Sequence, residues 1–95
     1  MVKRKGNDMS NATETTPNDL KGHTIAQLAR LCRNDWAKVN FAAVPYLEAM
    51  GTLEHINDPY GMDSGKSIVI YFLGNATSWR GDVARAVKKE LKRRL

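Results

Sequence analysis

Large apolar side chains are scarce at the start of the chain and recur at regular intervals after it. Residues 1–22 consist mainly of Asn, Asp, Thr, Ser and Lys. A segment of this composition buries too little surface to offset the entropy that it loses on ordering. We therefore expect a disordered, flexible N-terminal tail over residues 1–22, followed by a single helical domain over residues 23–95.

The first recurrent apolar pattern begins at Thr24. Thr24 and Gln27 have the spacing of a capping box, in which each side chain accepts a hydrogen bond from the backbone amide of the other residue. The apolar residues that follow are spaced by three and four, which places them on one helix face. They are Ile25, Leu28, Leu31 and Cys32. The pattern predicts a helix that starts directly after Thr24.

Capping residues and a proline divide the next part of the chain. Asn34 or Asp35 is suited to cap a short helical turn over residues 36–39. Pro45 has no amide proton and disfavours a helical residue before it, so it suits the start of a helix better than the interior. The sequence therefore predicts a second main helix over residues 45–54.

The middle of the chain contains one ambiguous apolar run. Residues 55–65 are dense in Asn, Asp, Pro and Gly, which predicts a loop. Residues 68–73, IVIYFL, have the β-branched and aromatic content of a buried strand, yet their apolar residues also fit a helix face. A single strand would leave its backbone groups unpaired. We therefore expect a helix over residues 64–77, capped by Asp63 or Ser64, with a strand at 68–73 as the alternative.

The clearest amphipathic pattern lies at the end of the chain. Ser78 is a suitable cap, Asp82 complements the positive end of the helix dipole, and apolar residues recur on one face. These features predict a helix over residues 79–94. The fold class that follows is all-α, a small bundle of about four helices. Its expected core consists of Ile25, Leu28, Leu31, Trp36, Leu47, Met50, Ile68, Val69, Phe72, Leu73, Trp79, Val83, Val87 and Leu91.

Composition indicates a small intracellular domain. Cys32 is the only cysteine, so no intramolecular disulfide can form, and no apolar run reaches the length of a signal peptide or a membrane span. The seven aromatic residues supply large burial areas, so folding requires no cofactor. We expect a cytoplasmic protein without a membrane partner.

One short motif resembles part of a nucleotide site. Gly65, Lys66 and Ser67 have the order that ends a phosphate-binding loop, but only three residues separate Gly61 from Gly65, where the motif has four. The motif must also follow a strand, which the pattern does not predict here. We therefore expect no nucleotide site, and a connection followed by a helix cap explains the same residues.

The residues that could carry catalysis or bind metal are isolated. His23 and His55 are the only histidines, and neither has a second ligand at a recognised metal-site spacing. Cys32 lies on the apolar face of its helix, without an activating base nearby in the sequence. We expect a protein without metal, cofactor or enzymatic activity.

The net charge of +5 is concentrated at the end of the chain. Residues 80–95 hold seven Lys and Arg against two Asp and Glu, whereas residues 24–79 hold four against five. At about 100° per residue, five of these cations project over a sector of roughly 140° of the last helix, opposite its apolar stripe. Like charges on one face repel one another unless a polyanion meets them, and phosphate backbones are the commonest such partner.

This basic helix gives the leading hypothesis for function. We expect a small binding module that contacts nucleic-acid backbone, with a protein-interaction or structural accessory module without nucleic-acid contact as the alternative. Trp79 is expected to pack in the core between the last two helices. The arrangement of a capped helix, a Pro-initiated helix and the segment YFLGNATSWRGDVARAVKKEL resembles that of small proteins of bacteria and their phages, and this resemblance assigns no role to any residue. The expected contact residues are Arg80, Arg85, Lys88, Lys89, Lys92 and Arg93.

Overall fold

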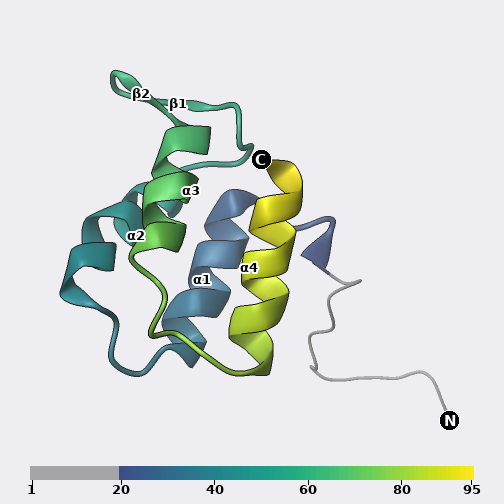
Figure 1. Ribbon diagram of the computed structural model, residues 1–95. Coiled ribbons are helices and arrows are strands. Elements are labelled where there is room, and N and C mark those ends of the chain that lie inside the picture. The colour runs from purple at the N-terminus through teal and green to yellow at the C-terminus, as the bar shows by residue number, and fades with distance from the viewer. Residues whose placement is uncertain (1–19) are drawn as a thin grey trace, which may run out of the picture.

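Two helix pairs make up the part of the chain that the computed structural model describes, residues 20–95. Helix α1 packs on α4, α2 packs on α3, and contacts between α1 and α2 join the pairs (Figure 1). The prediction of a mostly helical fold is confirmed. The term all-α is only approximate, because the fold also contains a small β-hairpin. The elements in order are α1 (Ile25–Asp35), the 3-10 helix η2 (Phe41–Ala43), α2 (Val44–Met50), β1 (Pro59–Tyr60), β2 (Asp63–Ser64), α3 (Gly65–Gly74) and α4 (Asp82–Arg94).

The capping box predicted at the start of α1 is present. The amide of Thr24 donates to the Gln27 side chain over 2.7 Å, and the amide of Gln27 donates to the Thr24 hydroxyl oxygen over 3.0 Å. A further amide of the first turn, that of Ala26, donates to the Leu53 carbonyl over 2.8 Å. The start of α1 is therefore joined to the segment that follows α2, and few of its amides are left unsatisfied.

The prediction of a short helical turn at residues 36–39 is wrong. Trp36 instead ends α1, where its amide donates to the Cys32 carbonyl over 2.8 Å. The next helical turn is η2, which begins after Asn40. The side chain of Asn40 accepts from the amide of Ala42 over 3.2 Å and so caps η2, a role that the sequence pattern assigned to earlier residues.

Helix α2 is shorter than the predicted range of 45–54. Pro45 lies in its first turn, as its missing amide favours, but the helix begins one residue earlier at Val44. It ends at Met50, and Gly51 forms the cap. Leu53 then turns into the core, where its side chain is buried, so the chain leaves the helix axis before residue 54.

Residues 68–73 form a helix, so the strand alternative is wrong. Ser64 caps α3 as predicted, because its hydroxyl oxygen accepts from the amide of Ser67 over 3.1 Å. The helix ends at Gly74 rather than continuing to residue 77. The β-branched side chains do not prevent the helix, since burial of one face outweighs their local preference.

The loop predicted over residues 55–65 contains the two-stranded hairpin. Pro59 pairs with Ser64 and Tyr60 with Asp63, around a turn in which Gly61 has φ of 60°. Where the hairpin meets α3, a Cβ on Gly65 would lie 2.7 Å from the Ile56 carbonyl oxygen. The glycines of the supposed phosphate loop thus form a hairpin turn and a close backbone contact.

Helix α4 starts three residues later than predicted. It begins at Asp82 with Gly81 as its cap, so Ser78 does not cap it and Trp79 lies in the turn before it. Gly81 has φ of 109°, a conformation that interrupts any helix continuing from residue 79. Trp79 lies outside the helix, and its side chain packs in the core.

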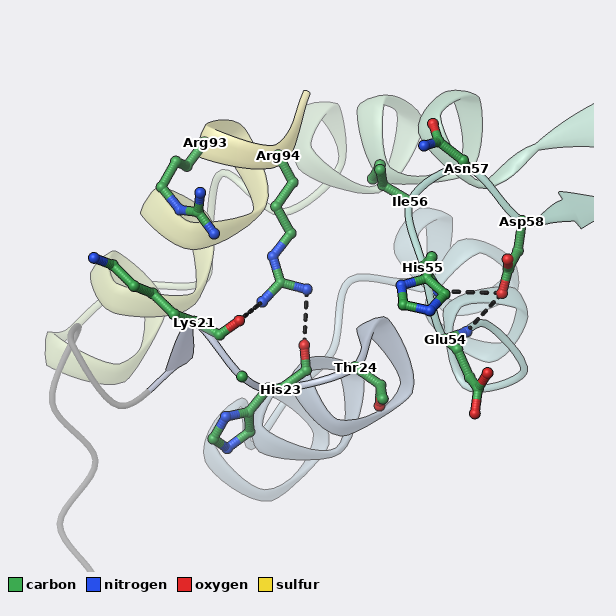
Figure 2. A pocket seen from close by; sticks show the side chains of 11 residues that line it. Lys21, His23, Thr24, Glu54, His55, Ile56, Asn57, Asp58, Arg93 and Arg94 are labelled. Atoms are coloured by element: carbon green, nitrogen blue, oxygen red, sulfur yellow. Dashed lines mark hydrogen bonds between the residues drawn. The ribbon is translucent and has the colours of Figure 1, made fainter.

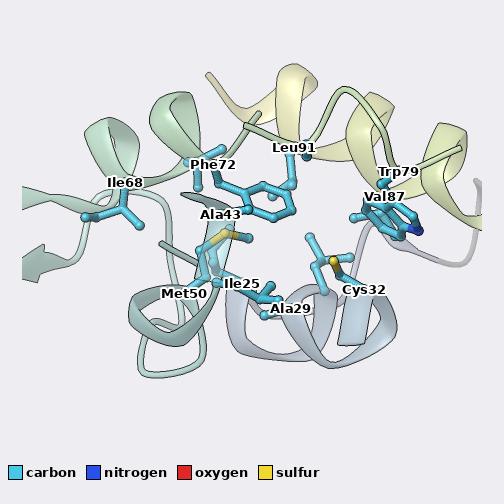
Figure 3. Packing of buried hydrophobic residues seen from close by; sticks show 14 of the residues in the cluster. Ile25, Ala29, Cys32, Ala43, Met50, Ile68, Phe72, Trp79, Val87 and Leu91 are labelled. Carbon is cyan, nitrogen blue, oxygen red and sulfur yellow. The ribbon is translucent and has the colours of Figure 1, made fainter. Parts of the chain in front are cut away.

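The core lies among the four α-helices, all of which contribute side chains to it, and most of its members were predicted (Figure 3). Of the predicted core residues, Leu31, Leu73 and Val83 are only partly buried, whereas all the others are buried. The pattern missed small residues at the helix contacts, which allow the backbones to approach closely. The missed alanines are Ala29, Ala43, Ala49, Ala76, Ala84 and Ala86.

The predicted tail of residues 1–22 extends too far along the chain. Leu20 is fully buried in the same core cluster as the helices, so the folded domain includes it. Residues 1–19 lie outside the described part, and the expectation for them stays a prediction. Among residues 20–95, every helix is too short or too polar to cross a bilayer.

Candidate nucleic-acid interface

The turn before α4 is held in place by Trp79. Its indole Nε1 donates to Asp35 Oδ2 over 2.8 Å, its ring stacks on Trp36 with centroids 5.9 Å apart, and Phe72 contacts it edge-on with centroids 6.5 Å apart. These contacts join α1, α3 and the turn before α4. The core role predicted for Trp79 is therefore confirmed. Its contacts also hold in place the turn from which α4 starts.

Lys88 folds back onto this turn. Its Nζ donates to the Trp79 carbonyl oxygen over 2.7 Å and lies 5.9 Å from the centroid of the indole ring. Burial lowers the pKa of the Lys88 ammonium below its ordinary value, and the positive charges of Lys92 and Arg80 lower it further. Lys92 and Arg80 thus both lie close enough to Lys88 for their charges to repel it.

The outer positions of α4 carry the remaining cations. Arg85 pairs with Asp82 one turn earlier, but both side chains are largely exposed, so the pair is screened by water. Lys89 and Lys92 are exposed. Within residues 20–95, no ion pair joins Arg80, Lys89 or Lys92 to a carboxylate. Positive charge is therefore left uncompensated along this face of α4.

Arg93 differs from the other predicted contact residues. Its guanidinium donates twice to the carboxylate of Glu90, from Nε over 3.1 Å and from Nη2 over 2.6 Å. This bidentate pair neutralises much of its charge, although the Arg93 side chain remains half exposed. Arg93 stands at the edge of the basic surface and is bound to an acid of its own helix.

Glu90 is buried and holds a second arginine that the sequence analysis did not single out. Arg94 Nε donates to Glu90 Oε2 over 2.6 Å. The remaining nitrogens of Arg94 donate to the carbonyl oxygens of His23 over 2.8 Å, Leu20 over 2.9 Å and Lys21 over 3.1 Å. The spacing of Glu90 and Arg94 by four residues was the only sequence signal for this contact.

A groove of about 550 Å³ lies beside this contact (Figure 2). Arg94 and the segment from Lys21 to Thr24 line one side, and residues 54–58 line the other. Asp58 Oδ2 accepts from the amides of Glu54 and His55, each over 3.1 Å, which lowers the pKa of the Asp58 carboxyl below its ordinary value. The groove has positive and negative groups on opposite sides, so it does not continue the positive surface of α4.

The candidate catalytic and metal-binding residues stay apart. Nowhere in residues 20–95 do three or more His, Cys, Asp or Glu side chains gather as a metal site requires. Cys32 is buried, and burial raises the pKa of its thiol to about 12, so the reactive thiolate is scarce at neutral pH.

Comparisons with known proteins give no relative. No protein-family model, no curated protein and no solved structure matches this chain. The function must therefore be argued from the charge, contacts and exposed surfaces of the chain itself.

Proposed function

We propose that this protein is a small nucleic-acid-binding module that holds the phosphodiester backbone on one face of α4. The surface, which we call the α4 basic face, consists of Arg85, Lys88, Lys89 and Lys92 of α4 together with Arg80 in the turn before the helix. Arg93 of the predicted set is left at its edge because it pairs with Glu90. The observation that carries the proposal is the run of Lys and Arg side chains along one side of α4, with Lys88 folded back onto the Trp79 turn that Arg80 follows.

Bringing cations together in a folded protein costs free energy unless an anion meets them. A structural role would favour acids among them, yet within the described residues only Arg85 of the face pairs with a carboxylate. A phosphate backbone offsets the repulsion, and its bound counterions are released as the protein's cations replace them. The absence of compensating acids among residues 20–95 thus favours a polyanion over a purely solubilising surface.

The length of the face suits successive phosphates. Arg85, Lys88, Lys89 and Lys92 cover two helical turns, about 10 Å along the axis. Phosphates of one strand of duplex DNA are separated by about 3.4 Å along the duplex axis, so the face can meet two or three of them. Contacts of this kind position a protein on the backbone but do not read sequence.

Salt dependence of binding tests this proposal. The full chain is titrated against a fluorescein-labelled DNA duplex of mixed sequence and against a single strand, with fluorescence anisotropy measured from low to physiological salt. We expect the logarithm of affinity to fall with the logarithm of salt concentration, with a slope of about −2 to −3 for the duplex, as two or three phosphate contacts imply. Binding that is absent at low salt, with the protein folded, would overturn the proposal.

A matched pair of variants locates the surface. The double variant Lys89→Gln with Lys92→Gln should make the salt slope shallower by about two, because two phosphate contacts are lost. The control is Lys38→Gln with Lys66→Gln, which removes the same charge from exposed positions outside α4. Equal losses in both double variants would show that binding follows net charge and not the α4 basic face.

A further inference from the structure

Charge is distributed unequally between the two helix pairs. Helix α4 carries eight charged residues among thirteen, whereas α3 carries only Lys66 and the segment from η2 through α2 carries only Glu48. The charged helix α4 belongs to the α1/α4 pair, and the nearly uncharged surface belongs to the α2/α3 pair (Figure 1). The helices of the α2/α3 pair therefore expose few charged side chains.

Helix α3 is apolar on its outer side as well as on its inner side. Its inner face packs Ile68, Val69 and Phe72 into the core. Its outer stripe, at spacings of three and four, consists of Ser67, Ile70, Tyr71 and Gly74, and we call it the α3 outer face. Ile70 is 48% exposed and Tyr71 is 54% exposed. Apart from Lys66 and Ser67 in its first turn, α3 therefore has apolar residues on its exposed side as well, and exposed apolar residues gathered on one face are typical of contact surfaces.

Neighbouring aromatic side chains extend this face. The ring of Tyr46, from α2, packs against that of Tyr71 with centroids 5.5 Å apart, which holds Tyr71 in position. The Asn40 side chain donates to the Asn75 carbonyl over 2.9 Å, which ties η2 to the end of α3. Phe41, the residue after Asn40, is 89% exposed. Phe41 therefore adds a large apolar group held by an ordered backbone.

We propose that the α3 outer face is a homodimer interface, on which a second copy of this chain packs its own α3 about a two-fold axis. Ile70 and Tyr71 lie at the middle of the stripe, so they would meet their counterparts near the axis. Ser67 and Gly74 lie at its ends, where small side chains leave room for Tyr71 of the second copy.

The low charge of the α2/α3 side permits a second copy to approach. Two chains of net charge +5 repel one another, and this repulsion is smallest where the surfaces that meet carry few charges, as on the α2/α3 side. The face also offers no charge pattern by which a different protein could be selected. Self-association through an apolar stripe requires no such pattern, and homodimer interfaces are the more apolar class.

The exposed apolar area is of the right size. The exposed parts of Phe41, Ile70 and Tyr71 amount to an area on the order of 400 Å². A standard interface buries about 800 Å² on each partner, of which somewhat more than half is apolar. The α3 outer face with Phe41 can therefore supply most of the apolar part of one side of a weak dimer. The proposal does not depend on nucleic-acid binding.

Sedimentation velocity of the full chain without nucleic acid tests this interface. We expect a concentration-dependent dimer in the range of about 10 to 500 μM, and at least about a tenfold weaker dimer for Ile70→Glu. The matched control is Leu95→Glu, which makes the same kind of change at an exposed apolar residue of the α1/α4 side. A wild-type protein that stays monomeric would overturn the proposal and leave the face to a different protein. Equal dissociation constants for the two variants would also overturn it.

Crosslinking keeps the test valid if Ile70→Glu fails to fold. Ile70→Cys should form a disulfide-linked dimer under mild oxidation, since residues near a two-fold axis meet their own copies. Leu95→Cys should not, and buried Cys32 does not compete for oxidation. Equal crosslinking of the two variants at the same concentration would overturn the two-fold arrangement.

Discussion

Glu90 illustrates how one side chain organises the surface at the end of the chain. Its side chain is 4% exposed and is the only charged side chain that is buried in residues 20–95. A buried carboxylate is tolerated only when its oxygens are fully hydrogen-bonded, and here Arg93 and Arg94 supply the donors. Arg94 then joins the end of α4 to the carbonyl oxygens of residues 20–23, more than seventy positions earlier in the chain.

Removing the charge of Glu90 should destabilise the fold. In Glu90→Gln, the partly buried Arg94 keeps its charge but loses its counter-charge, and we expect the free energy of unfolding to fall by about 2–4 kcal/mol. Urea unfolding followed by circular dichroism measures the change. Asp82→Asn is the matched control, because its ion pair with Arg85 is exposed and its loss should be barely detectable. Comparable losses for the two variants would contradict this account.

The contribution of Glu90 should also depend on pH. Hydrogen bonds from Arg93, which outweigh the effect of burial, lower the pKa of the Glu90 carboxyl from 4.5 to about 2. Because the pKa is lower in the folded state, the ionised carboxylate stabilises the fold above pH 4.5, and this stabilisation is lost as the pH falls toward 2. The difference in unfolding free energy between wild type and Glu90→Gln should therefore narrow between pH 7 and pH 3. A constant difference would contradict the assigned pKa.

At the scale of elements, a single glycine decides where α4 begins. Gly81 has φ of 109°, which separates the Trp79 turn from the first residue of the helix. A helix from residue 79, as the sequence pattern predicted, would have removed Trp79 from Trp36 and Asp35. The pattern could not reveal this, because the polar residues before Asp82 are compatible with either start. The contacts of Trp79 with Asp35 and Trp36 also come from residues more than forty positions away.

Replacement of this glycine should weaken the start of α4. Gly81→Ala places a side chain in a backbone conformation that L-residues rarely adopt, so we expect the free energy of unfolding to fall by about 1–2 kcal/mol. Gly74→Ala is the control, because Gly74 has an ordinary helical φ and a Cβ there meets no atom within 4 Å. Thermal unfolding by circular dichroism should show a lower midpoint for the first variant and an unchanged or higher one for the second. The reverse order would contradict the role given to Gly81.

The whole molecule separates its charge from its exposed apolar surface. The α4 basic face lies on the α1/α4 pair and the α3 outer face on the α2/α3 pair (Figure 1). Both proposed partners can therefore be present at once: the two-fold axis would leave each α4 free of the dimer contact. The two interactions rest on different forces, electrostatic attraction to phosphates in one case and apolar burial in the other.

Added salt should move the two interactions in opposite directions. Raising the salt concentration from about 50 to about 500 mM screens both the attraction to DNA and the repulsion between two positive chains. We expect nucleic-acid affinity to fall and self-association to strengthen, as measured by fluorescence anisotropy and sedimentation velocity on one preparation. A dimer that dissociates as salt rises would show that it is held by charge and not by the α3 outer face.

The sequence by itself determined the local features that depend on neighbours along the chain. The capping box at Thr24, the cap at Ser64, the helical class and the apolar faces follow from spacings of three and four residues, so they could be predicted. The concentration of cations after residue 79 is likewise a property of sequence alone. We chose the predicted contact residues from this concentration of charge, and their charge does not depend on the fold.

Only the tertiary structure decided which of those residues are available and where elements end. Arg93 and Arg94 are held by Glu90, Lys88 folds onto the Trp79 carbonyl, and Leu20 belongs to the core because contacts between distant segments outweigh local preference. The exposure of the outer side of α3 also depends on the tertiary structure. The sequence of an apolar helix does not show whether one face or the whole helix is buried. Spacing along the chain determines which side chains share a face, and packing determines which face meets water.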